Sequence, residues 1–130
     1  MRKYYLFKIN NKSNIKKIYL VLEELFYLNS NKFKYGISIF NNVCLKIDKK
    51  NIIDKLRNTY NLKDNKIFIN DLENTIVEIN NTCIVIKTSK NIPKIFKVIN
   101  LLESNILVCD FDSKDYFWLD DFIKLNFKLY

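Results

Sequence analysis

The feature that most constrains the fold is residues 106–122, ILVCDFDSKDYFWLDDF, whose pattern predicts an aromatic-rich β-hairpin. The run at 106–109 is entirely apolar, which is typical of a buried strand. A polar turn follows, because Asp and Ser side chains readily accept hydrogen bonds from nearby backbone amides. Residues 116–118 then return as a second strand that carries the single Trp. Each aromatic side chain buries about 150–250 Å², so we expect the rest of the chain to pack around this hairpin.

Apolar periodicity predicts a helical first half and a strand-rich second half. Ser13 or Asn14 is suited to cap the first helix, and Asp48 to cap the third. The predicted strands are 4–9, 66–70, 75–80, 82–88 and 122–130, besides the hairpin, and the predicted helices are 14–28, a segment within 37–47, 49–60 and 93–103, with a polar loop at 29–34. We therefore expect an α+β fold, a single domain over residues 1–130, with a mostly antiparallel β-sheet packed against about four helices.

Two expectations concern how neighbouring elements meet. The second and third helices have almost no connecting residues, so we expect them to pack as a tight angled pair. Asn80-Asn81 is suited to a two-residue hairpin turn, which would set Ile79 opposite Thr82 and Val77 opposite Ile84. That register places Val77, Ile79, Ile84 and Ile86 on one core-facing side and Ile76, Cys83 and Val85 on the other.

Composition excludes several classes of site. The chain has no His, 1 Gly and 3 widely spaced cysteines, which leaves no usual zinc site and no Gly-rich phosphate loop. We therefore expect reduced, buried thiols and no cofactor. No apolar run approaches the roughly 18 residues of a membrane span, and the N-terminus does not look like a signal peptide. The expected location is the cytoplasm, without membrane association.

The net charge of +8 favours an anionic partner, either nucleic acid or an acidic protein surface. Only Arg2 and Arg57 represent arginine, the residue that clamps phosphates and reads bases best. The lysines are scattered through every segment, which indicates a solvated surface. The sequence thus argues against direct nucleic-acid binding, although a basic adaptor or nucleic-acid-associated module stays open as the alternative function.

Little in the sequence supports catalysis. Without His the commonest general base is missing, and a calcium loop starting at Asp110 would put Lys114 at a ligand position. An enzyme with Asp110 or Asp112 as its catalytic residue remains a minor alternative hypothesis. The helix at 14–28 has more apolar residues than one buried face requires, including Leu20, Val21 and Tyr27. That excess favours a non-enzymatic binding protein with its site on the early helices.

The hairpin also carries a family resemblance. An apolar strand followed by Asp110, Phe111, Ser113, Lys114, Tyr116, Trp118 and Leu119 resembles the C-terminal signature of the SirA family, the bacterial sporulation inhibitors of replication. The opening YYLFKIN, with Tyr4 and Tyr5, and the stretch YGISIFNN at 35–42 are similar to two further parts of that family. Asp112 and Phe117 depart from the usual Asn and Gly. We interpret the motif itself as structural.

The resemblance implies a function and a partner. SirA-family members bind the N-terminal domain of the initiator DnaA and block initiation of DNA replication. The resemblance therefore implies that this chain is a non-enzymatic inhibitor that is monomeric in complex with DnaA and connected with sporulation. The family's contact surface is formed largely by the early helices. By resemblance, that surface would include or adjoin Lys17, Asn41, Asn42 and Cys44 of this chain.

Overall fold

The sheet is built outward from its N-terminal strand, β1 (Arg2–Ile9). The computed structural model describes residues 1–28, 33–69 and 74–127. Within them the strand order is β3-β4-β5-β6-β1-β7-β8, with β2 also paired to β1, and every pairing is antiparallel. The other strands are β2 (Cys44–Leu45), β3 (Leu62–Lys63), β4 (Lys66–Ile69), β5 (Thr75–Ile79), β6 (Ile84–Thr88), β7 (Ile106–Asp110) and β8 (Asp115–Trp118).

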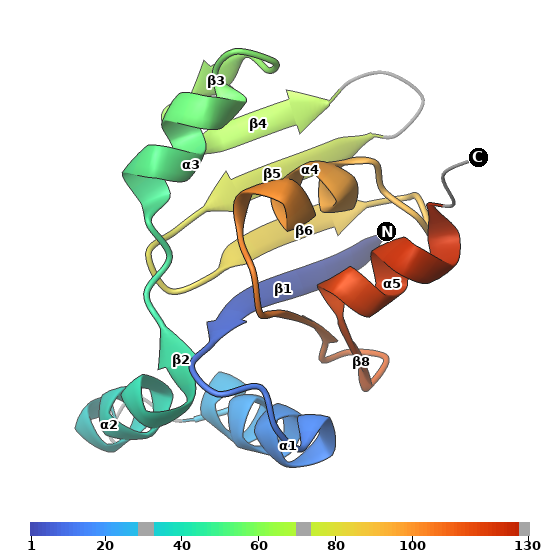
Figure 1. Ribbon diagram of the computed structural model, residues 1–130. Coiled ribbons are helices and arrows are strands. Elements are labelled where there is room, and N and C mark those ends of the chain that lie inside the picture. The colour runs from blue at the N-terminus through green and yellow to red at the C-terminus, as the bar shows by residue number, and fades with distance from the viewer. Residues whose placement is uncertain (29–32, 70–73, 128–130) are drawn as a thin grey trace.

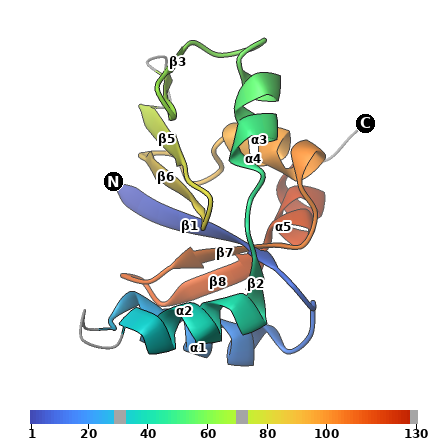
Figure 2. The ribbon, with the colours of Figure 1, turned by 90° about the vertical axis from the view of Figure 1, so that its left-hand side faces the viewer.

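Helices cover both faces of this twisted sheet. They are α1 (Ile15–Phe26), α2 (Phe33–Val43), α3 (Lys49–Leu56), α4 (Ile95–Leu102) and α5 (Leu119–Asn126). Helices α3, α4 and α5 lie on one face, whereas α1 and α2 lie on the other, beside the β7–β8 end (Figures 1 and 2). The predicted α+β fold with an antiparallel sheet is confirmed, with five helices in the described residues where about four were expected.

Two hydrophobic cores result, one on each face of the sheet. Alternate residues of β1 serve different cores: Tyr4 and Leu6 face α3, α4 and α5, whereas Phe7 and Ile9 face α1 and α2. The larger core includes Val77, Ile79, Ile84 and Ile86, the four residues that the sequence assigned to one face. The smaller core contains all three cysteines, which are free and buried, as expected.

The aromatic hairpin and both helix caps were predicted correctly. β7 is buried along its whole length, and β8 returns beside it with Trp118 opposite Leu107. Asn14 caps α1 by accepting from the Lys17 backbone N–H at 3.3 Å, and Asp48 caps α3 in the same way through Asn51. Helices α1, α3 and α4 are each shorter than predicted.

The second helix differs from its prediction at both ends. It already includes residues 33 and 34, assigned to a loop whose other residues, 29–32, lie outside the described residues. It stops at Val43, and Cys44–Leu45 instead pairs with β1 at Ile9 and Lys8. The physical reason is that β6 reaches β1 only as far as Leu6, which leaves the end of β1 with free hydrogen-bonding groups on that side.

The expected angled pair of second and third helices is wrong. After β2 the chain crosses to the other face of the sheet, where Ile47, Ile52 and Leu56 join the larger core. Phe40 and Val43 of α2 pack in the smaller core, so the sheet separates α2 from α3 (Figure 2).

The register of the 75–88 hairpin is shifted from the prediction. Ile79 pairs with Ile84, not with Thr82, and Val77 pairs with Ile86. The Asn80 N–H donates to Cys83 O at 3.0 Å, so four residues form the connection. Because the shift is an even number of residues, each side chain keeps its predicted face.

The C-terminal prediction of a strand at 122–130 is also wrong for its described part. Leu119 is fully buried and Phe122 and Ile123 pack against the same core, a spacing that suits one helix face. Leu125, which the strand pattern grouped with them, is 74% exposed. Residues 128–130 lie outside the described residues.

Candidate partner-binding surface

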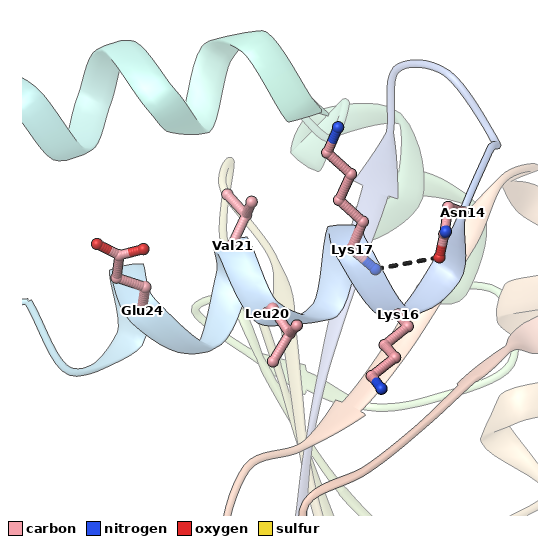
Figure 3. Close-up of a pocket in the computed structure, with 6 residues that line it drawn as sticks. All are labelled: Asn14, Lys16, Lys17, Leu20, Val21 and Glu24. Atoms are coloured by element: carbon pink, nitrogen blue, oxygen red, sulfur yellow. Dashed lines mark hydrogen bonds between the residues drawn. The ribbon is translucent and has the colours of Figure 1, made fainter.

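Helix α1 has a buried side and an open side. Ile18, Tyr19 and Leu22 pack into the smaller core. The open side contains a shallow hollow of about 320 Å³ that Figure 3 shows in close-up. Six residues line it: Asn14, Lys16, Lys17, Leu20, Val21 and Glu24.

The hollow has an apolar middle between charged ends. In Figure 3 the Lys16 and Lys17 side chains diverge at the N-terminal end of α1, and Leu20 and Val21 follow one turn later. Glu24 lies at the far end, and Leu20 is 50% exposed. An exposed Leu with polar neighbours is the composition of a small protein-contact patch, an apolar centre with a charged rim.

Helix α2 runs alongside α1 in the opposite direction. Gly36, near its start, approaches the end of α1 so closely that a Cβ there would lie 2.7 Å from Leu28 Cδ2. At its other end, Val43 O accepts from the Asn10 N–H at 2.9 Å, in the loop before α1. The end of α2 that carries Asn41 and Asn42 therefore lies near the N-terminal end of α1, where Lys17 is.

The predicted site residues separate into two groups. Lys17, Asn41 and Asn42 are exposed on α1 and α2. Cys44 is only 3% exposed and lies in β2, so it is a core residue that adjoins the exposed side chains from beneath and is not itself exposed. Burial also raises the pKa of the Cys44 thiol to about 12, which keeps it protonated and unreactive at neutral pH.

Ile37 of α2 is 44% exposed, although helical spacing relates it to Phe40 and Val43, which pack partly buried in the smaller core. Tyr27, at the end of α1, is 62% exposed. We call the outward-facing side chains of this layer the α1–α2 surface, and it comprises the half-buried Val21 and the exposed Lys16, Lys17, Leu20, Glu24, Tyr27, Ile37, Asn41 and Asn42.

The hairpin motif holds α1 in place. The Tyr19 ring stacks on Tyr116 at 4.3 Å between centroids and on Phe111 at 5.8 Å. The Tyr19 hydroxyl donates to Glu23 at 2.9 Å, and Lys114 pairs with the same carboxylate at 3.3 Å. Burial, and then the Glu23 hydrogen bond, raise the pKa of Tyr19 above its ordinary value. The motif thus seats α1 through aromatic stacking on one side and an ion pair at the rim.

Trp118 anchors the loop that precedes α1. It is 8% exposed, and the Lys12 amine lies 4.9 Å from its ring centroid. The same amine pairs with Asp120 at 3.0 Å. Cation–π contacts of this kind contribute about 0.5–1 kcal/mol at exposed sites, so the contact adds to the packing without dominating it.

Asp110 has structural partners that account for its burial. It is 3% exposed, accepts from Arg2 Nε at 3.0 Å, and also accepts from the Ser113 backbone N–H at 3.2 Å. The Ser113 bond closes the turn in which Lys114 adopts a φ of 55°. Asp112 is exposed. These contacts explain the motif Asp and Ser as turn-forming residues, in line with the structural interpretation of the motif.

Neither a cluster of metal ligands nor a membrane-spanning helix occurs among the described residues. They contain no group of three or more His, Cys, Asp or Glu side chains placed to hold a metal ion. Nor does any helix among them have the length and apolar character that crossing a membrane requires. Compared with known proteins, the chain matches no family model and no curated protein.

Proposed function

We propose that this protein is a non-enzymatic inhibitor of bacterial replication initiation that binds the N-terminal domain of DnaA through the α1–α2 surface. The DnaA partner and the link with sporulation come from the resemblance of the hairpin motif to the SirA family. The observation that carries the binding site is the apolar centre of α1, where Leu20 is half exposed inside a hollow rimmed by lysines.

The exposed apolar side chains of α1 and α2 support a protein partner. Leu20, Tyr27 and Ile37 are 50%, 62% and 44% exposed, although the same helices have a core to pack against. Burying one such side chain in an interface stabilises a complex by about 1.5–3 kcal/mol before the costs of association. A few of them, with their rim, suffice for a small transient interface.

The polar residues around this centre support specificity. Lys16 and Lys17 at the start of α1 favour a partner with carboxylates nearby, because complementary charge speeds association and excludes wrong partners. Asn41 and Asn42 can each donate and accept, which suits the polar rim of an interface.

The test is calorimetric titration of the purified protein with the N-terminal domain of its host's DnaA. Titrations at about 0.1 M and about 1 M salt distinguish an apolar interface from binding by charge attraction alone, since the Debye length falls from about 10 Å to about 3 Å and screens exposed charges. We expect saturable binding at both concentrations, with only moderate weakening at high salt.

Two results would contradict the proposal. No heat of binding at either salt concentration would mean that the resemblance extends to the fold but not to the partner. Binding that is unchanged by substitution of Leu20, but lost on substitution elsewhere, would move the site away from the α1–α2 surface. A matched control is Leu101 of α4, which is 80% exposed on the opposite face of the sheet.

A further inference from the structure

One part of the sheet has no helix over it in the described residues. Helices α1 and α2 cover the β7–β8 end of their face, and Figure 2 shows the same side of β5 and β6 without a covering element. The side chains there form an open sheet face that comprises Lys3, Lys66, Phe68, Ile76, Glu78, Val85 and Lys87.

The strand register gathers these residues in two rows across the sheet. Phe68 lies opposite Ile76, Ile76 opposite Lys87, and Lys87 opposite Lys3. In the second row Lys66 lies opposite Glu78, and Glu78 opposite Val85. Residues opposite each other in antiparallel strands project on the same side, so lysines lie on two sides of the Phe68 ring.

The face is basic, and the contact that its lysines have in the described residues is that of the Lys3 amine with the Tyr5 ring, 5.2 Å from the ring centroid. The rows above hold three lysines and one glutamate, and Lys63 of β3 lies opposite Lys66 on the same side. Lys8, Lys12 and Lys114 each form an ion pair elsewhere in the molecule. By contrast, none of Lys3, Lys66 and Lys87 has an ion pair within the part of the chain that the structure describes.

Phe68 is the most informative residue of this face. Its ring is 48% exposed, with Ile76 and Val85 beside it. The hollow among these side chains is about 160 Å³, smaller than the roughly 300–1,000 Å³ of pockets that enclose small molecules. The face is therefore a platform for a flat group, not an enclosing pocket.

We infer that this open sheet face binds single-stranded nucleic acid without sequence preference. One unpaired base would stack on Phe68, while Lys3, Lys66 and Lys87 bind the phosphates on either side. An exposed ring on a sheet, with cations near it on the same side, is the arrangement that single-strand binders use. The sequence argued against nucleic acid because its lysines are scattered along the chain, but the β-pairings bring three of them to one side of the sheet.

The inference is independent of the DnaA proposal, because the two surfaces share no residue. Its test is fluorescence anisotropy. A labelled single-stranded oligothymidine, about as long as one turn of duplex DNA, is titrated with the full chain at several salt concentrations. Neutralising three phosphates releases counterions, so the slope of log K against log salt should be about −2. An unlabelled duplex of equal length should compete poorly, because its bases are already stacked.

Matched variants separate stacking from general charge attraction. Phe68→Ala should lower the affinity at least about fivefold, the effect of losing one stacked base. Lys87→Gln should reduce the salt slope by about 0.7, the share of one phosphate on a single strand. Lys50→Gln on α3 and Leu20→Asp on α1 should change neither quantity, and all four variants should keep the native circular dichroism spectrum.

Several outcomes would overturn the inference. Absence of binding at low salt would do so directly. If Phe68→Ala bound the oligonucleotide as tightly as the unchanged protein, the binding would be explained by the net charge of +8 and not by stacking. Capture of poly-glutamate in place of the oligonucleotide, or a dimer in sedimentation that Phe68→Ala dissolves, would assign the face to a protein partner or to a second copy.

Discussion

The ring of Tyr19, on α1, stacks on the ring of Tyr116, on β8, with centroids 4.3 Å apart and planes inclined by 19°. This contact joins the early helix that carries the candidate surface to the hairpin that carries the family-like motif. The motif therefore acts on the surface indirectly, by fixing the position of α1 on the sheet.

Replacing Tyr19 should separate stacking from hydrogen bonding. Tyr19 is 3% exposed, so Tyr19→Ala should cost about 3–5 kcal/mol of unfolding free energy through the cavity it leaves. Tyr19→Phe keeps the ring and loses only the bond to Glu23, about 0.5–1.5 kcal/mol. Urea denaturation measures both. Equal losses in the two variants would show that the hydroxyl, not the stack, holds α1.

Trp118 should behave as a scaffold residue. At 8% exposure in the smaller core, its replacement by Ala should cost about 3–5 kcal/mol, a large part of the total 5–15 kcal/mol typical of a domain. Thermal unfolding followed by circular dichroism measures this loss. A Trp118→Ala protein that stayed folded yet no longer bound DnaA would reverse the roles assigned to motif and surface.

Substitutions on the α1–α2 surface should have the opposite profile. Lys17→Ala and Asn41→Ala remove exposed side chains, so the melting temperature should stay nearly unchanged while binding to the DnaA domain weakens. Leu20→Asp should weaken binding about tenfold or more, since it places an unpaired charge at the apolar centre. Calorimetry gives the affinities, and Leu101→Asp is the control that should bind normally. Loss of stability in step with loss of binding would argue against a surface role.

Gly36 should set the distance between α2 and α1. A Cβ at this position meets the tip of Leu28, a flexible side chain. Gly36→Ala should therefore be nearly neutral, because about 1 kcal/mol of helix propensity offsets the rotamer shift of Leu28. Gly36→Leu should cost about 1–3 kcal/mol by overpacking, and Leu28→Ala in the same chain should recover part of it. A large loss from Gly36→Ala alone would mean that Leu28 cannot move.

Stability should fall at alkaline pH because of the buried thiols. Burial raises the pKa of Cys44 to about 12 and of Cys83 to about 11, from 9.0 for a free thiol. Above pH 9.0 the unfolded chain therefore releases thiol protons that the folded chain keeps, so stability falls as pH rises towards those folded values. Urea midpoints across this range measure the effect.

The same burial predicts slow thiol chemistry. A thiol-reactive disulfide reagent should react slowly with the native protein at neutral pH and with all three cysteines in denaturant. Replacing Cys44 by Ala should lower the number of thiols that react in denaturant. It should also reduce the loss of stability at alkaline pH. Rapid reaction of a thiol in the native state would show that the smaller core opens.

The local sequence pattern predicted an element correctly where the element's own residues decide its conformation. The apolar run before Asp110 and the aromatics after Lys114 specify a hairpin, because the turn chemistry between them is local. The caps Asn14 and Asp48 are local for the same reason. The alternation that put Val77 and Ile79 on one face also survived a change of register, since a two-residue shift preserves the side.

Tertiary structure decided whatever depends on a distant partner. The second helix ends at Val43 because the end of β1 needs a strand partner, which no pattern within residues 33–47 indicates. The C-terminal segment alternates like a strand, but its place over the larger core makes Leu119, Phe122 and Ile123 the buried set of a helix.

The same distinction applies to the two proposed surfaces: the sequence indicates the first, and only the strand pairing creates the second. The excess of apolar residues on α1 could be read from its sequence, because a helix with one buried face has no other place for Leu20. Phe68, Lys87 and Lys3 belong to three separate strands, and only the pairing of β4, β5, β6 and β1 places them in one row on the same side of the sheet. Sequence determines which side of a strand a residue occupies, whereas long-range pairing determines which residues share that side with it.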